Sequence, residues 1–212
     1  KEKPFFDFKI KKDMFYSKSF DLRDIKLCKK FIEDVIKRWG TIHGIVFYAG
    51  ITNISPLTEC SEATYDDLFD INLKSTFFLC QSVVKNMIKN NGGSIIFIGS
   101  SHMESGDMDR AAYAISKGGL QILSNNISKN YAKFNIRSNI IIMGWTPTKG
   151  ELKLRESQGV TLDELELNAS NYIPMGRMLN ENDPIPALMY FLSDESLMAT
   201  GSIVRVNGGE YI

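Results

Sequence analysis

The sequence predicts an α/β protein built on one doubly wound parallel sheet, and three observations favour this fold class. Short runs of β-branched and aromatic residues alternate with longer segments whose apolar residues recur at helical spacing, as in repeated β-α-β units. Two of the short runs are almost wholly apolar, which is typical of strands covered by helices on both faces. No repeat, low-complexity tract or Gly/Ser linker interrupts the chain, so we expect one domain over residues 1–212.

The first half of the chain contains two predicted strand–helix pairs. Residues 14–20 have the alternation of a strand, and 24–39 carry an apolar stripe at helical spacing. Residues 42–48 form a short apolar strand, and one long helix is expected over 62–90. Gly92-Gly93 then ends that helix.

The second half continues the same alternation. Residues 94–98 and 137–143 are the two continuous apolar strands, and 110–134 form a long helical pattern between them. A Gly- and Pro-punctuated insertion with one or two helices spans 146–172. A helix over 184–193 and a last strand over 202–206 complete the pattern. Ligands of such sheets bind beyond the carboxyl ends of the strands, where the polar segments of this chain gather.

Composition and charge exclude several classes of function. Apolar residues make up 43% of the chain, and no apolar run approaches the ~18 residues that a membrane span needs. Because 25 Lys and Arg balance 25 Asp and Glu, no overall positive field indicates a nucleic acid. We therefore expect a small-molecule partner or a second copy of the chain, and neither a nucleic acid nor a membrane.

The cysteines and the N-terminal residues indicate a reducing compartment. Cys28, Cys60 and Cys80 are scattered and lack metal-ligand or CxxC spacing, so we expect free thiols and no metal site. The first residues, Lys-Glu-Lys-Pro, contain no basic-then-apolar signal segment. The expected location is the cytoplasm.

The clearest chemical pattern is Tyr-Ala-Ile-Ser-Lys at 113–117. Residues i and i+4 share one face of a helix, so the ammonium of Lys117 and the phenol of Tyr113 point into the same space. A nearby positive charge lowers the pKa of a tyrosine from its ordinary value near ~10. The pair then exchanges protons near neutral pH. Taken alone, such a pair is more often a solvated contact on a helix face.

Two further polar residues set this pair in context. Ser100 follows a buried strand thirteen residues before Tyr113, and Asn72 lies in the preceding helix. With these residues the chain resembles the short-chain dehydrogenase/reductase family, in particular its sugar and polyol dehydrogenases and its 3-oxoacyl-acyl-carrier-protein reductases. Further matching segments extend over nearly the whole chain: Asp21, Ala49-Gly50, Gly144 to Thr148, Ile173 to Arg177, Thr200-Gly201 and Asn207-Gly208-Gly209.

The resemblance implies a Rossmann-like fold and hydride transfer with a nicotinamide cofactor. Tyr113 would be the general acid or base at the substrate oxygen, and Lys117 would tune Tyr113 and bind the nicotinamide ribose. Ser100 would hold the substrate oxygen, and Asn72 would keep a water that links Lys117 to solvent. The implied reaction interconverts a secondary alcohol and a ketone, with a sugar or polyol favoured over a 3-oxoacyl thioester.

The resemblance also implies contacts with NAD or NADP and with the substrate. The expected cofactor-binding residues are Asp21, Leu22, Ala49, Gly50, Tyr113, Lys117, Gly144, Thr146 and Thr148. Two of these have simpler alternatives, because Asp21 can cap the helix that begins near Asp24 and Gly50 can serve a turn. The expected substrate contacts are Ser100, His102, Met103 and Trp145, together with the insertion 146–172 as a substrate loop. Glu104 and Arg110 lie in the same stretch of sequence. That His102 and Glu104 simply face solvent is an equally supported alternative to a role in the substrate pocket.

Two departures from the family pattern bear on the site and on cofactor binding. Phe47-Tyr48 replaces a usual Asn-Asn pair, and we expect Tyr48 to pack in the core. The Gly-rich turn that binds a pyrophosphate at a helix N-terminus occurs nowhere in the sequence. A preceding β-α-β segment or a gap in the sequence is favoured over a naturally shortened, non-catalytic binding or scaffold protein, because a sheet without its central strand would expose apolar strand edges. The residue that selects NAD or NADP belongs to the same missing stretch, so this choice is also open.

The resemblance finally implies a homotetramer or homodimer. The predicted helices 62–90 and 110–134 and the last strand are the elements through which family members pair. Leu120, Ile122, Leu123 and Ile127 on the second helix serve either the core or such an interface.

Overall fold

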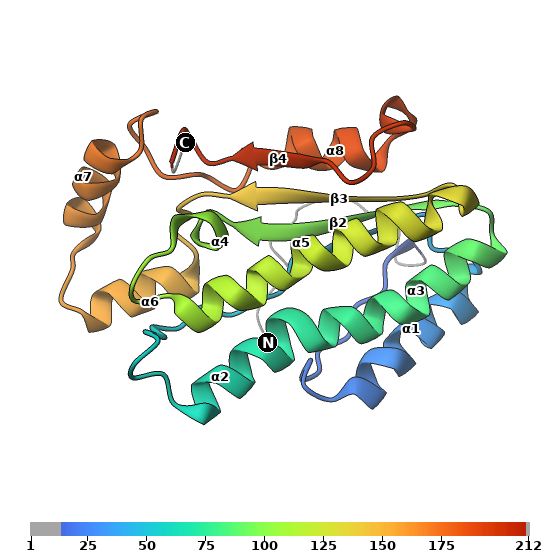
Figure 1. Cartoon of the computed structure of the whole chain (residues 1–212), viewed down its shortest axis with the longest axis horizontal. Coiled ribbons are helices and arrows are strands. Elements are labelled where there is room, and N and C mark those ends of the chain that lie inside the picture. Colours follow the sequence, from blue (N-terminus) through green and yellow to red (C-terminus); the bar gives the residue numbers. More distant parts are fainter. Residues whose placement is uncertain (1–13, 211–212) are drawn as a thin grey trace.

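The computed structural model describes residues 14–210, and in this part of the chain four parallel strands form one sheet (Figure 1). Neighbouring strands pair in the order β1-β2-β3-β4. The register sets Phe47 beside Phe97 and Ser100 beside Met143. The bounds are β1 (Gly44–Phe47), β2 (Gly93–Ser100), β3 (Ile136–Met143) and β4 (Ile203–Val206). The predicted parallel sheet is confirmed, and the ends of these four strands lie within two residues of the prediction.

Helices follow the strands in the predicted alternation. Their bounds are α1 (Ile25–Trp39), α2 (Glu62–Phe69), α3 (Ser75–Lys89), α4 (His102–Ser105), α5 (Ala111–Tyr131), α6 (Lys149–Ser157), α7 (Leu162–Tyr172) and α8 (Ile185–Leu192). Three short turns of other helix types complete them, the π-helix η2 (Asp70–Lys74) and the 3₁₀ helices η3 (Ala132–Phe134) and η4 (Asp194–Ser196).

Both faces of the sheet are covered, as a doubly wound fold requires. Alternate side chains of β2 point to opposite faces. Ile95 and Phe97 pack in one apolar cluster with residues of α1, α3 and α5. Ile96 and Ile98 pack in a second cluster with Phe191 of α8. These four neighbouring side chains of β2 are all buried, which explains the continuous apolar run in the sequence.

The start of α1 shows which acidic residue caps this helix. The Asp24 carboxylate accepts hydrogen bonds from the backbone N–H of Lys26 at 2.9 Å and of Leu27 at 3.0 Å. The Asp21 carboxylate accepts from the N–H of Arg23 at 2.9 Å, before the helix begins, and the Asp21 carbonyl accepts from the N–H of Asp24. The alternative in which Asp21 caps the helix is therefore wrong.

The prediction of a strand over 14–20 is also wrong. A strand requires a hydrogen-bonded neighbour, and this segment pairs with no strand among the residues that the structure describes. Its aromatic rings pack on α1 instead. Tyr16 stacks on Phe31 with ring centroids 5.7 Å apart, and Phe20 lies 5.5 Å from the same ring.

The single long helix predicted over 62–90 is interrupted. One turn at 70–74 widens into the π-helix η2, which separates α2 from α3. Asn72 lies in this turn and is 1% exposed. A π-helical turn inside an α-helix is rare and is often found at functional sites, because it redirects one side chain.

Polar segments gather at the carboxyl ends of the strands. Figure 1 shows α6 and α7 beyond the arrowheads of β3 and β4, with α4 directly after β2. The N-terminal end of α5 lies beside α4. This edge is the one at which the sequence predicts ligand binding. Within residues 14–210, no helix is both long and apolar enough to cross a membrane.

Candidate active site

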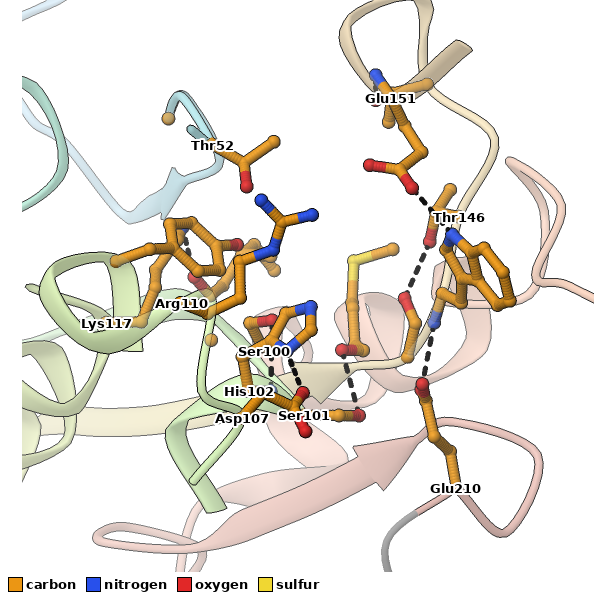
Figure 2. Close-up of a pocket in the computed structure, with 18 of the residues that line it drawn as sticks. Thr52, Ser100, Ser101, His102, Asp107, Arg110, Lys117, Thr146, Glu151 and Glu210 are labelled. Atoms are coloured by element: carbon orange, nitrogen blue, oxygen red, sulfur yellow. Dashed lines mark hydrogen bonds and ion pairs between the residues drawn. The ribbon is translucent and has the colours of Figure 1, made fainter. Parts of the chain in front are cut away.

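A cavity of about 600 Å³ opens at the carboxyl ends of the strands (Figure 2). This volume is in the range of small-molecule sites. Its walls come from the segment after β1, the end of β2, the start of α5, the segment after β3, and α6 and α7. Segments distant in the sequence therefore meet at one place, as the parallel sheet requires.

The structure brings three of the four predicted catalytic residues to this cavity. Ser100, at the end of β2, and Tyr113 and Lys117, one turn apart on α5, all line it. The fourth residue, Asn72, lies behind the wall and does not line the cavity. The arrangement places two hydroxyl groups and one amine around a common space.

Asn72 is a fully engaged structural contact. Its amide oxygen accepts a hydrogen bond from the N–H of Ile51 at 2.9 Å. Its amide nitrogen donates to the carbonyl of Ile51 and to Oγ of Ser116, each at 3.0 Å. Asn72 thus fastens the segment after β1 to α5. Gly50 lies in that segment, and a Cβ atom there would lie 3.0 Å from Oδ1 of Asn72 and 3.1 Å from Nζ of Lys117.

Two opposing effects act on the phenol of Tyr113. Burial raises its pKa, because the charged phenolate loses solvation. The hydrogen bond with Ser100 and then the positive charge of Arg110 oppose this rise, whereas the charge of Glu151 adds to it. The sequence assigned the favourable cation to Lys117. In the structure the cation that lowers the pKa of Tyr113 is Arg110.

Lys117 is shifted in the direction expected of a buried amine. Desolvation lowers its pKa to about 8. The side chain is 5% exposed, and Nζ donates a hydrogen bond to the carbonyl of Ile98 at 3.1 Å. Lys117 therefore gains or loses a proton close to neutral pH.

The predicted cofactor residues divide into two groups. Gly50, Gly144, Thr146 and Thr148 line the cavity with Tyr113 and Lys117. Asp21, Leu22 and Ala49 do not line it. Asp21 pairs with Arg23 at 2.7 Å, and Leu22 packs against the core beneath α1. Thr148 also caps α6, because its hydroxyl accepts from the N–H of Glu151 at 3.2 Å.

The predicted substrate residues also divide. His102 and Trp145 line the cavity. His102 packs edge-on against the ring of Tyr113 at 5.8 Å, and its Nδ1 lies 2.6 Å from Oδ2 of Asp107. Met103 does not line the cavity, and its side chain packs against the core, so its contact with a substrate stays a prediction.

Two neighbouring expectations are settled by contacts. Glu104 forms an ion pair with Arg205 of β4 and does not line the cavity. Tyr48 is 53% exposed and lines the cavity, so the expectation of core packing is wrong. The preceding residue, Phe47, is buried and stacks on Phe97, and alternation along β1 turns Tyr48 away from that cluster.

Sequence reasoning missed several lining residues. Glu151 lies in the predicted substrate loop, accepts from Nε1 of Trp145 at 2.9 Å and pairs with Arg155 at 2.7 Å. Glu210 accepts from the N–H of Trp145 at 3.0 Å, and burial raises the pKa of its carboxyl. Thr52 lines the cavity beside the guanidinium of Arg110 (Figure 2). Only the position of Glu151 within 146–172 signalled such a role, since the other contacts arise from tertiary packing.

The chain is similar to known oxidoreductases. A family profile described as Enoyl-(Acyl carrier protein) reductase matches residues 9–210. The 3-oxoacyl-(acyl-carrier-protein) reductase FabG of Thermotoga maritima is 32% identical over 181 residues, covering 85% of this chain and 71% of that protein. The 2-dehydro-3-deoxy-D-gluconate 5-dehydrogenase of Escherichia coli is 30% identical over 196 residues, covering 92% and 76%. A gluconate 5-dehydrogenase from Burkholderia cenocepacia, solved with NADP and tartrate, superposes with a TM-score of 0.81 at 25% identity, covering 90% of this chain and 72% of that one.

Proposed function

Because the chain belongs to the short-chain dehydrogenase/reductase family, we propose that it interconverts a secondary alcohol and a ketone with NAD or NADP. The favoured substrate is a small hydroxylated molecule, a sugar or polyol. The observation that carries the proposal is the meeting of Ser100, Tyr113 and Lys117 on one cavity at the carboxyl ends of the strands. These groups supply proton transfer at a substrate oxygen.

The cavity fits the nicotinamide end of such a cofactor. The backbone at Gly50 passes so close to Lys117 that no larger residue is accommodated without displacement. Gly50, Lys117, Gly144, Thr146 and Thr148 would hold the nicotinamide and its ribose. When bound, the cofactor supplies or accepts the hydride. Asp21, Leu22 and Ala49, which lie outside this cavity, remain proposed contacts of the rest of the nucleotide.

The proton steps use the residues of this chain. In alcohol oxidation the substrate O–H loses its proton to the phenolate of Tyr113 while the carbon loses hydride, which leaves a C=O group. In reduction the phenol of Tyr113 returns the proton to the oxygen as the carbon gains hydride. Ser100 holds that oxygen through a hydrogen bond and stabilises its developing charge. Lys117 exchanges its proton near neutral pH and is proposed to pass it to solvent through a water kept beside Asn72.

A 3-oxoacyl thioester is the second candidate substrate. The 32% identity with the FabG reductase supports it. The polar wall of the cavity, with Thr52, Asp107 and Glu151, favours a hydroxylated molecule. In the cavity these polar groups take the place of water as hydrogen-bond partners of the substrate hydroxyls. The segment 146–172 is proposed to close over either substrate.

Purified protein assayed with NAD and NADP tests this function. The panel contains sugars, polyols and 3-oxoacyl thioesters, and absorbance of the reduced nicotinamide reports turnover. We expect turnover of hydroxylated molecules. Turnover of thioesters alone would overturn the sugar preference, and no binding of either nucleotide would support the non-catalytic scaffold alternative.

We also propose that the chain pairs with copies of itself through the outer face of α3 and α5. A mainly apolar groove of about 740 Å³ runs between η2, α3 and α5. Ile122 and Phe77 line it and are 69% and 47% exposed. By contrast, Leu120 and Ile127 are core residues, 2% and 3% exposed. A dimer or tetramer covers the exposed set.

A further inference from the structure

Arg110 is a buried charge that the proposed proton steps leave unused. Its side chain is 2% exposed and lines the cavity. In the described part of the chain, the buried side-chain nitrogen and oxygen atoms without a hydrogen-bond partner are Nε and Nη1 of this residue. Its nearest counterion is Asp109, whose Oδ2 lies 3.8 Å from Nε and whose side chain is 54% exposed. Burying a guanidinium without hydrogen bonds is costly, so a missing partner is expected.

Other arginines with restricted exposure are satisfied by the protein. Nη1 of Arg137 donates to Ser196 at 2.8 Å, and Nη2 donates to the carbonyl of Ser193 at 3.2 Å. Arg155, which lines the same cavity, donates to Glu151 at 2.7 Å. Arg110 differs from both because its planar donor edge faces the cavity rather than a protein acceptor. Figure 2 shows its guanidinium reaching into the cavity on the side of Thr52.

The backbone fixes Arg110 relative to the reacting groups. Arg110 precedes α5 as its N-cap, three residues before Tyr113, which is the spacing of neighbours on one helix face. Ser55 is fully buried and holds both sides of this segment. Its N–H donates to the carbonyl of Asp109 at 2.8 Å, and its hydroxyl accepts from the N–H of Tyr113 at 3.3 Å. A molecule held by Arg110 therefore has its other end near Tyr113 and Ser100.

We propose that Arg110 binds a carboxylate of the substrate, so that the enzyme acts on short hydroxy or oxo acids. This inference rests on the proposed function and names its substrate class. The flat fork of a guanidinium matches the two oxygens of a carboxylate in a bidentate pair. The acid group anchors the molecule at Arg110, and its alcohol or ketone lies at the hydroxyls of Ser100 and Tyr113.

The other charges of the cavity favour a carboxylate over a phosphate. Asp107, Glu151 and Glu210 also line it. A phosphate ester carries up to two negative charges and meets more repulsion from these carboxylates than a singly charged acid does. One positive charge on Arg110 balances one negative charge on the ligand.

The test compares short hydroxy acids with their uncharged amides in NAD- and NADP-linked assays. In the unmodified protein we expect kcat/KM to favour each acid by roughly 30- to 100-fold, the loss typical of a missing charged hydrogen bond. Arg110→Gln should remove this preference, and Arg110→Lys should keep part of it because the charge remains. Arg155→Gln is the matched control, since this cavity arginine already has a protein partner, and should retain the preference.

Three results overturn the inference: amides that react as well as acids, a phosphate ester preferred over both, or an equal loss in the Arg110→Gln and Arg155→Gln variants. Binding of a hydroxy acid without turnover, measured by calorimetry, separates the inference from the proposed function. Acid binding that depends on Arg110 supports the anchor even if no substrate reacts. If Arg110→Gln does not fold, the acid-to-amide ratio and the Arg110→Lys variant decide.

Discussion

At the scale of single residues, the site is defined by which polar groups the protein already satisfies. Asn72 uses its amide on Ile51 and Ser116, so it acts through position. Ser100 and Tyr113 keep hydroxyls on the cavity, and Arg110 keeps donors there. Two hydroxyls and a guanidinium therefore face the cavity. The proposed reaction requires such groups, because it transfers a proton to or from a substrate oxygen.

Lys117 carries a cost that depends on pH. Its pKa is about 8 in the folded protein and near ~10.4 in an unfolded chain, so the unfolded chain binds more protons between these values. Folding is therefore penalised below pH 8, and the penalty fades as pH rises from 8 toward 10.4. The variant Lys117→Met lacks this ionisable group and serves as the reference. We expect the free energy of unfolding of the unmodified protein to rise, relative to that of the variant, by on the order of 3 kcal/mol across this window.

Chemical denaturation of both proteins at several pH values measures this difference. A difference that stays constant with pH would show that the amine has an ordinary pKa. Lys117→Met should at the same time lose turnover, since the variant cannot exchange a proton.

Sequence reasoning predicted which residues share the site better than it predicted their electrostatics. The spacing of Tyr113 and Lys117 placed both on one face of α5. It did not show that Arg110, rather than Lys117, would lower the pKa of the phenol. That depends on where the backbone at the start of α5 is held, and Ser55, far away in the sequence, bonds the backbone of Asp109 and Tyr113 on either side of Arg110.

At the scale of elements, the π-helical turn η2 is the feature that local periodicity does not reveal. The apolar pattern over 62–90 continues through this turn, so one helix was the natural prediction. From this turn Asn72 bonds the backbone of Ile51, a tertiary contact that the local pattern does not contain. The prediction of a strand over 14–20 was wrong for a related reason. An extended segment is a strand only if another strand pairs with it, and the local pattern does not show such a partner.

Asn72→Ala should destabilise the protein and release the segment that contains Gly50. It leaves the N–H and carbonyl of Ile51 without their partner, which costs about 2 kcal/mol. Asp70→Ala in the same turn is the control, because Asp70 pairs only with the exposed Lys74 and should cost less than about 0.5 kcal/mol. Urea denaturation compares the two. An equal cost would mean that the Asn72 contacts are not specific.

At the scale of the whole molecule, the parallel direction of the strands followed from sequence because a helical segment joins each strand to the next. Parallel strands linked in this way bring their carboxyl ends to one edge. The position of Glu210 in the cavity wall could not be predicted from sequence, because it depends on close tertiary packing against Gly144. A Cβ atom at Gly144 would lie 2.7 Å from both Glu210 and the backbone of Asn207.

The same scale includes assembly. We expect light scattering after gel filtration to show a dimer or tetramer, and Ile122→Glu to lower the assembly state by placing a charge in the apolar groove. Leu57→Glu is the control, because Leu57 is 82% exposed and does not line that groove. A monomeric parent protein would contradict the proposed interface, as would an unchanged state of Ile122→Glu.

The measurement closest to the central claim compares Tyr113→Phe with the parent protein. The variant removes one hydroxyl and keeps the ring that packs against His102. We expect kcat to fall by about 100- to 10,000-fold, as when a general acid is lost, while fluorescence titration shows similar affinity for the reduced nicotinamide cofactor. Turnover near the parent level would show that Tyr113 is not the proton donor and would contradict the proposed mechanism.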